Sequence, residues 1–448
     1  MSRVLILTAV TAVYGIWAGA AFATSGAGLS VGADEVFGPD PKLEAPKTSL
    51  VPKVNVAKAV GWAGGQKPTV PAGLDVSQYA SGLDHPRWLY QLPNGDVLVA
   101  ESNKPPQQAT GIKGWIMGLV MARAGAGVDS ANRITRLADT DGDGKVDETS
   151  TFLSNLYSPF GMALIGDDFY VANADAIIRF KYQSGAKTIS GQGVEVVKLP
   201  GGPRNHHWTK NILASPDGKR LYVTVGSNSN VGENGMDEEL QRATVLEVSL
   251  ADGKTRTFAS GLRNPNGLAY KPGTDELWTV VNERDELGDN IVPDYLTSVK
   301  DGAFYGWPYS YFGQNIDTRI TPNNAQLVAK AVKPDYALGA HTASLGLAFS
   351  NDKTLGPAFA SGAFIGQHGS WNRTAPAGYR VIFVPFSEGR PAGQPVVVLG
   401  GFLDADGQAR GRPVGVIADQ RGGVLVADDV GNKIWRVSAG KATADAGR

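Results

Sequence analysis

The segment Ile212-Leu213-Ala214-Ser215-Pro216-Asp217-Gly218, which leads into Leu221-Tyr222-Val223-Thr224, contains the pattern on which most of the chain is built. A short apolar stretch ends at a Pro-Asp-Gly turn, and a second stretch rich in Leu, Val and Tyr follows. Apolar and polar residues that alternate between such turns indicate half-buried antiparallel strands rather than helices. The segment therefore predicts a unit of two paired strands.

Past residue 74 this two-strand unit occurs six times. The other copies run from His85 to Ala100, from Ser158 to Ala172, from Asn264 to Val280, from Ser344 to Ile365 and from Pro413 to Ala427. Units that recur every roughly 50 to 80 residues cannot each bury a face alone, and radial stacking as propeller blades satisfies them. We predict an all-β fold, a six-bladed β-propeller. A large β-sandwich is the alternative, but sandwiches lack a recurring unit of this kind.

The N-terminus has the features of an export signal. Met1-Ser2-Arg3 precedes an uncharged apolar stretch that ends in Ala21-Phe22-Ala23, a plausible cleavage site. An uncleaved membrane anchor is the alternative, and both place the folded part in the periplasm or outside the cell. We predict four regions: a signal peptide or anchor at 1–23, a linker or extended strap at 24–73, the propeller at 74–440 and a disordered tail at 441–448.

The composition restricts the function. The 448 residues include 42 basic and 43 acidic side chains, so the chain has no electrostatic footprint for nucleic acid. It contains no cysteine, which excludes disulfides, thiolate nucleophiles and cysteine-bound metals. Redox chemistry would then require a bound cofactor. The expected partner is a small molecule.

Several polar residues stand at the starts of the repeats, where propellers build their ligand sites. His206 and His207 are adjacent, and a neutral imidazole there could act as a general base, although a histidine pair in a loop is also common as a purely structural feature. Arg263 with Asn264, and Arg412, precede the fourth and sixth units in matching places. Two such arginines suggest one anionic ligand, whereas ion pairs between blades are the structural alternative.

Taken together, these motifs resemble the L-sorbosone dehydrogenase branch of the soluble quinoprotein glucose and aldose dehydrogenases, over about residues 80 to 437. The resemblance is carried, in this order, by Arg204 to Lys210, Gly261 to Leu268, Asn282 to Asp289, Tyr305 to Pro308 and Gly411 to Val416. In that family a propeller holds pyrroloquinoline quinone (PQQ), a calcium ion polarises the quinone, and a histidine takes the sugar hydroxyl proton as hydride passes to the quinone.

The resemblance implies roles for individual residues. His207 matches the family's base, and His206 stands where the glucose enzymes have a supporting aspartate. Arg263 and Asn264 match residues that contact the quinone oxygens, Asn282 is a further cofactor contact, and Arg412 matches the first of two arginines that bind the cofactor's carboxylates. The second arginine is replaced by Val414. Backbone carbonyls of Glu283 and Arg284 match the positions that hold the cofactor-linked calcium.

Other channel residues are not matched so closely. His341, Gln367, His368 and Arg373 fall in loops of the fifth unit and are candidates for cofactor or substrate contact, with Arg373 assigned to the cofactor. The resemblance implies a sugar or aldehyde as substrate and an electron acceptor of the respiratory chain as partner.

A separate calcium signal lies between residues 139 and 147. Asp139, Asp141, Asp143 and Asp147, with Gly144 in the sixth place, resemble the start of an EF-hand loop, but Ser150 stands where the final glutamate is expected. We expect a structural calcium site here, and a plain acidic hairpin is the alternative.

The apolar insertion from Gly111 to Arg123 is too short to span a bilayer. It is expected to contact a membrane surface, cap the channel or pack on the rim.

Two other functions remain open on the sequence. One is a calcium-dependent lactonase, which would need Glu, Asp and Asn side chains converging from several blades. The other is a non-enzymatic propeller that binds protein or glycan.

Overall fold

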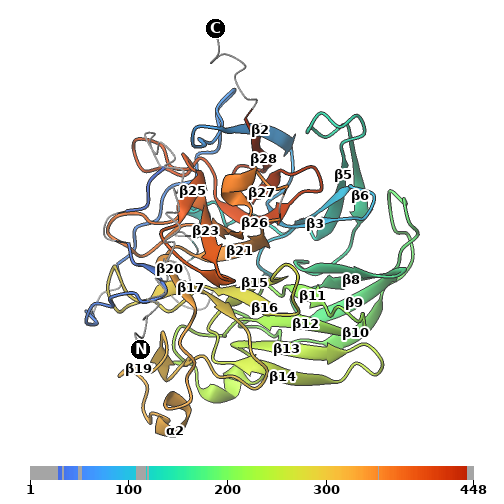
Figure 1. The fold of residues 1–448 in the computed structure, drawn as a ribbon. Helices are drawn as coiled ribbons and strands as arrows, with labels where there is room; N and C mark the ends of the chain where they lie inside the picture. The colour runs from blue at the N-terminus through green and yellow to red at the C-terminus, as the bar shows by residue number, and fades with distance from the viewer. Residues whose placement is uncertain are drawn as a thin grey trace, which may run out of the picture.

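Six antiparallel sheets stand around a central axis in the computed structural model of this chain, as Figure 1 shows. The described residues are 29–32, 35–48, 53–106, 118, 121–351 and 353–440. The predicted six-bladed propeller is confirmed. Each predicted two-strand unit forms the two innermost strands of one blade.

The first three blades follow the chain without interruption. Their strands, each list running outward from the axis, are β3 (Pro86–Gln91), β4 (Val97–Glu101), β5 (Arg133–Ala138) and β6 (Glu148–Leu153); β7 (Met162–Ile165), β8 (Asp168–Ala172), β9 (Ala176–Lys181) and β10 (Val194–Lys198); and β11 (Ile212–Ala214), β12 (Arg220–Val225), β13 (Thr244–Ser249) and β14 (Thr255–Ser260).

The fourth to sixth blades have additions. The fourth contains β15 (Pro265–Tyr270), β16 (Leu277–Val281), β17 (Pro293–Ser298) and β20 (Tyr336–Ala340), with the hairpin β18 (Ser310–Tyr311) and β19 (Asn315–Ile316) and helix α2 (Ala325–Val328) inserted before β20. The fifth contains β21 (Ser344–Phe349), β22 (Gly362–Gln367), β23 (Arg380–Ser387), β24 (Arg390–Pro391) and β25 (Val396–Leu399). The sixth contains β26 (Pro413–Ala418), β27 (Val424–Asp428) and β28 (Lys433–Ala439). Two short 3₁₀ helices are η1 (Met236–Glu239) and η2 (Pro357–Phe359).

The ring is closed by a strand from the beginning of the propeller. β2 (Leu74–Ser81) pairs antiparallel with β28 and completes the sixth blade, so the blue and red ends of the colour scale lie side by side in Figure 1. This pairing joins the first blade to the last and removes the free edge that an open ring would present.

The innermost strands pack tightly around the axis. Strands β3, β26, β21 and β15 contact one another in that order around the ring. A Cβ atom on Gly346 of β21 would collide with the carbonyl oxygen of Val414, and one on Gly415 of β26 would lie 2.8 Å from the carbonyl oxygen of Arg87. Glycine at these positions lets neighbouring blades approach closely near the axis.

The described residues N-terminal to β2 contact several blades. Strand β1 (Phe37–Gly38) pairs with β20, and isolated bridges join Ala59 to Ala409 and Thr69 to Gly400. The predicted signal segment 1–23 and tail 441–448 lie outside the described residues. In the described part of the chain, no helix has the length and apolar character needed to cross a membrane.

Candidate active site

One end of the ring opens into a cavity of about 220 Å³ at the axis. Its walls come from the starts of β3, β15, β21 and β26, from the loop before β11, and from residues just after β16, β22 and β27. In an antiparallel pair the start of one strand and the end of the next lie at the same edge, so the repeats deliver their loops to this point. The lining includes His207, Asn264, Asn282, His368 and Arg412.

His207 is oriented by Ser227. The Nδ1 atom of His207 lies 2.7 Å from the carbonyl oxygen of Ser227 and 3.1 Å from its hydroxyl oxygen, which itself donates to the carbonyl oxygen of Ser229. Both atoms near Nδ1 therefore accept, and Nδ1 carries the hydrogen. The Nε2 atom is left with its lone pair, which is the form a general base needs.

The environment keeps the His207 ring neutral. Burial, then the neighbouring charges of His206 and Arg263, hold the pKa of His207 well below its usual value of 6.5. The buried Lys210 stabilises the loop that carries His207, because its Nζ donates to the carbonyl oxygen of Trp208 at 3.0 Å. Burial also lowers the pKa of Lys210 well below 10.5.

Many buried polar atoms around this cavity have no hydrogen-bond partner among the described residues. They are Nε2 of His85, Nε of Arg87, Oδ1 of Asn264, Oδ1 of Asn266, Nε and Nη2 of Arg412, and Oδ1 of Asp429. A buried polar group left unpaired costs about 1–3 kcal/mol, so such atoms are rare in folded proteins. Their concentration on one cavity indicates a site built for a polar ligand.

Asp429 lines the cavity and lies close to three basic side chains. Its Oδ2 atom lies 2.5 Å from Nη1 of Arg87, 2.8 Å from Nε2 of His368 and 3.5 Å from Nε2 of His85. Burial raises the pKa of the Asp429 carboxyl, but the surrounding basic groups outweigh it and hold the pKa well below 3.8. Burial lowers the pKa of His85 to about 4 and also lowers that of His368.

The structure separates the arginines that the sequence grouped together. Arg412 lines the cavity with Asn264 and Asn282. Arg263 lies behind the wall, where Nη1 donates to the carbonyl oxygen of Glu283 at 2.7 Å and Nη2 donates to Oδ1 of Asn230 at 3.0 Å. Its guanidinium supports the wall rather than facing the cavity.

Arg373 and Gln367 also lie outside the lining of this cavity. Arg373 donates from Nε to the carbonyl oxygen of Asp289 and from Nη2 to Oδ1 of Asn290. These bonds fix the loop between β16 and β17. Gln367 is fully buried and donates to the carbonyl oxygen of Leu338. The cofactor role of Arg373 stays a prediction.

The carbonyl group of Glu283 does not fit a cation in this structure. It accepts from the guanidinium of Arg263, and the buried guanidinium of Arg284 lies next to it in the chain, paired with Glu283 and Asp317. A calcium ion here would have to displace Arg263 and sit beside positive charge. The quinone-linked calcium at Glu283 and Arg284 stays a prediction.

The acidic loop of the first blade brings three carboxylates together. Ligand atoms of Asp139, Asp141 and Asp147 lie within 4.8 Å of one another, while Asp143 is not part of this group. Asp139 also pairs with Arg421, and Asp147 accepts from the backbone and hydroxyl of Thr140. The structural calcium stays a prediction.

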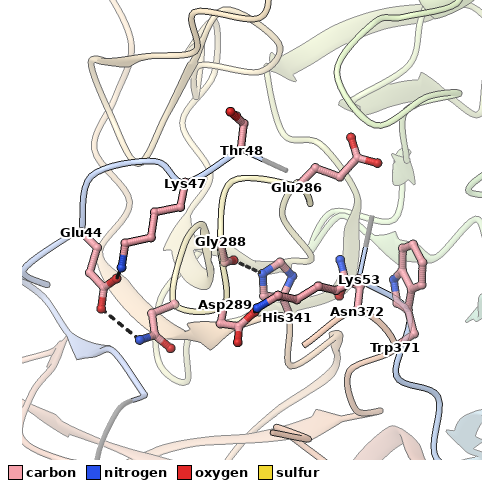
Figure 2. Close-up of a pocket in the computed structure, with 11 residues that line it drawn as sticks. Glu44, Lys47, Thr48, Lys53, Glu286, Gly288, Asp289, His341, Trp371 and Asn372 are labelled. Atoms are coloured by element: carbon pink, nitrogen blue, oxygen red, sulfur yellow. Dashed lines mark hydrogen bonds and ion pairs between the residues drawn. The ribbon is translucent and has the colours of Figure 1, made fainter. Parts of the chain in front are cut away.

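A second cavity of about 450 Å³ adjoins the first, and Trp371 lines both. Figure 2 shows Trp371 at one end and the Glu44–Lys47 pair at the other, with His341 between them. Lys53 binds Asp289 at 3.0 Å, and Asn290 donates to Glu44 at 3.0 Å. The charged groups of this cavity therefore largely neutralise one another, and a neutral polar molecule suits it.

His341 lines this second cavity rather than the axial one. Its Nδ1 lies 3.1 Å from a carboxylate oxygen of Asp285 and its Nε2 lies 2.8 Å from the carbonyl oxygen of Gly288. Both neighbours only accept, so both ring nitrogens carry hydrogen and the ring is positively charged. Burial lowers the pKa of His341, but Asp285 outweighs it and the pKa is raised above 6.5.

Sequence reasoning missed His85, Arg87 and Asp429. A signal for His85 was present, because it precedes a proline at the start of its repeat, as Asn264 and Arg412 do. Arg87 and Asp429 carried no such signal. The insertion 111–123 lies largely outside the described residues, but Met121 near its C-terminal end is exposed and lines the axial cavity.

The fold is a six-bladed propeller, and its axial cavity is lined by buried polar side chains. Residues 118–440 match the TrAA12-like family, and the chain belongs to that family.

Relatives include an uncharacterised protein of Borreliella burgdorferi, 31% identical over 64% of this chain and 77% of that protein. The chain is also 25% identical to the pyrroloquinoline quinone-dependent pyranose dehydrogenase of Coprinopsis cinerea, over 40% of this chain and 30% of that enzyme. An aldose sugar dehydrogenase of Escherichia coli is 29% identical over 41% of this chain and 44% of that enzyme. The matched region thus spans less than half of either dehydrogenase.

Solved structures of the same fold include the holo form of the PQQ domain of pyranose dehydrogenase from Coprinopsis cinerea. It has a TM-score of 0.68 and 19% identity, and the match covers 86% of this chain and 100% of that one. A calcium structure of a family AA12 enzyme from Trichoderma reesei has a TM-score of 0.65 and 18% identity, covering 87% and 99%. At these identities the likeness shows the fold.

Proposed function

We propose that this chain is a PQQ-dependent dehydrogenase that oxidises an aldose or a sorbosone-like sugar aldehyde outside the cytoplasm, passing electrons to an acceptor of the respiratory chain. The observation that carries the proposal is the axial cavity, whose lining combines the neutral base His207 with residues that have buried donors and acceptors without a partner among the described residues. Membership of the TrAA12-like family and the two dehydrogenase relatives support it.

The residues of the cavity suit a planar quinone with several carboxylates. Arg412 offers unpaired N–H groups to a carboxylate, and its guanidinium is stacked on Tyr379, with the Cζ atom 4.8 Å from the ring centroid. Asn264 and Asn282 also line the cavity, from the fourth blade. When bound, PQQ supplies an acceptor for two electrons from the substrate carbon. These residues would hold and orient it.

His207 then has a defined task. Its Nε2 lone pair accepts the proton of a substrate hydroxyl, either the anomeric hydroxyl of an aldose or that of a hydrated aldehyde. The carbonyl oxygen of Ser227 fixes the ring orientation and stabilises the imidazolium that forms. Lys210 keeps the loop in place.

The second cavity is the proposed path for the sugar. Its balanced charges suit an uncharged polyhydroxyl molecule, and Trp371 provides an apolar ring face at the boundary with the axial cavity. Sugar rings combine hydroxyl groups with an apolar face, so a tryptophan beside polar side chains is a suitable surface.

A lactonase would need side-chain carboxylates converging on the axis. Among the described residues that line the axial cavity, Asp429 is the sole carboxylate, and Arg87 and His368 already engage it. Hydrolysis by a central ion therefore has less support than oxidation.

The test is reconstitution of the purified apoprotein. PQQ is added with and without calcium, and reduction of an artificial dye is followed with a panel of aldoses and with sorbosone. We expect turnover that requires PQQ and is lost in His207→Ala. An apoprotein that binds no PQQ under any of these conditions would exclude the proposal and favour a binding propeller.

A further inference from the structure

The resemblance implies two arginines that bind the cofactor's carboxylates, but position 414, where the second would stand, is a valine. Val414 is fully buried at the start of β26, and its carbonyl oxygen faces Gly346 and Gly366 of the neighbouring blade. Val414 carries no charge and is not among the residues that line the cavity. A second positive group must come from another strand if the ligand carries more than one carboxylate.

We propose that Arg87 is this second group: with Arg412 it forms a two-arginine clamp for the carboxylates of the cofactor, and Asp429 holds Arg87 in position. This inference rests on the proposed function, because it concerns the same site. It names a binding residue that neither the sequence motifs nor the resemblance assigned.

The first support is position. Arg87 lies on β3 and Arg412 immediately precedes β26, and these two innermost strands are neighbours in the closed ring. Their backbones touch, because a Cβ atom on Gly415 would lie 2.8 Å from the carbonyl oxygen of Arg87. Both side chains line the axial cavity from adjacent blades.

The second support is how the two guanidinium groups are held. Arg87 lies over Trp208 at 5.8 Å from the ring centroid, and Arg412 lies over Tyr379 at 4.8 Å. Each is backed by an aromatic ring, which helps to orient the planar group. Nε of Arg87 and Nε and Nη2 of Arg412 remain buried without a partner among the described residues.

The third support is the charge balance. The cavity is lined by two guanidinium groups and by one carboxylate, that of Asp429. The histidines His85 and His368 add no positive charge at neutral pH, because burial lowers the pKa of both. The adjacent Asp428 is turned away, and its Oδ2 accepts from the indoles of Trp62 and Trp435. Excess positive charge in a closed space favours an anion, and unpaired guanidinium donors favour a carboxylate.

Asp429 holds the guanidinium of Arg87 in a fixed orientation. The Oδ2 atom of Asp429 lies 2.5 Å from Nη1 of Arg87 and 2.8 Å from Nε2 of His368. The Nε atom of Arg87 has no partner among the described residues, and we assign this edge of the guanidinium to the ligand. Asp429 is thus a positioning residue, and Arg87 a binding residue.

The experiment measures binding of PQQ to the apoprotein by titration calorimetry, without turnover. Arg87→Met removes the charge but keeps an unbranched side chain against Trp208. Arg136→Met is the matched control, because Arg136 is a buried arginine of the same blade, paired with Asp96 at 2.6 Å and outside the cavity lining. We expect Arg87→Met to weaken PQQ binding roughly ten- to a hundredfold, the usual size of a lost charged hydrogen bond, and Arg136→Met to bind as the wild type does.

A second ligand identifies the contact. The trimethyl ester of PQQ keeps the ring but has no carboxylate charge, so we expect wild type and Arg87→Met to bind it with similar affinity. If Arg87→Met proves unstable in thermal melts, Arg87→Lys replaces it and is expected to show an intermediate affinity for PQQ.

The outcomes separate this inference from the proposed function. Wild-type protein that binds PQQ, with an Arg87→Met variant that binds it equally well, would overturn the clamp and leave the dehydrogenase proposal standing. Wild-type protein that fails to bind PQQ would remove both. An equal loss in Arg136→Met would attribute the effect to fold stability and would also overturn the clamp.

Discussion

The Nδ1 atom of His207 lies 2.7 Å from the carbonyl oxygen of Ser227, twenty residues further along the chain. This single contact decides the tautomer of the ring, because a carbonyl oxygen can only accept. The Nε2 atom therefore carries the free lone pair and can accept a proton.

His207→Ala should abolish the base without removing the cofactor site. A positioned general base contributes about a hundredfold to ten-thousandfold to the rate, so kcat should fall by that range. PQQ affinity should stay near that of the wild type, because Arg412 and the asparagines are untouched. Added imidazole should restore part of the activity. A variant that keeps wild-type kcat would show that another group accepts the proton.

The pH dependence of kcat/KM should reflect the buried ring. Burial and nearby positive charge hold the pKa of His207 well below 6.5, so its Nε2 stays unprotonated at neutral and mildly acidic pH. The acid limb of the profile should accordingly fall below pH 6.5. Initial rates between pH 4 and pH 9 measure this. A limb centred above pH 6.5 would contradict the neutral-ring assignment.

His341 should stabilise the protein most strongly at acidic pH. Its pKa is raised above the unfolded value of 6.5 by Asp285, so its contribution is complete below about pH 6.5 and is lost as pH rises through the folded pKa. His341→Gln should therefore lower the free energy of unfolding more at pH 5.5 than at pH 9. Urea denaturation at the two pH values measures the difference. An equal loss at both would mean that the ring is neutral in the fold.

Gly346→Ala should destabilise the ring between the fifth and sixth blades. The added methyl group would collide with the carbonyl oxygen of Val414, and overpacking of this kind costs about 1–3 kcal/mol. Gly191→Ala is the control, because a Cβ atom there meets no other atom within 4 Å. Thermal and urea unfolding of both variants test the point. Equal stability of the two would show that the blades can separate without cost.

Much of the architecture could be read from the sequence. The six two-strand units were visible as repeats because turn residues and alternating apolar residues are local signals, and each unit became the inner pair of one blade. Asn264, Asn282, His207 and Arg412 were identified as site residues, and all four line the axial cavity.

Other parts of the site could not be predicted from local patterns. Arg263 stands at the start of a repeat as Arg412 does, but neighbouring carbonyl oxygens take up its guanidinium and remove it from the cavity. His341 and Trp371 belong to a second cavity whose other wall comes from the N-terminal strap around Lys47. No spacing in the sequence indicates that these segments meet.

The sequence by itself determined the repeat, the number of blades and the end of the ring at which polar loops gather. Tertiary structure decided which side chains share the cavity. Arg87 and Asp429 are 342 residues apart in the chain and lie 2.5 Å apart in space. They meet because β2 completes the last blade and brings β3 against β26, and a contact made by ring closure leaves no trace in either local sequence.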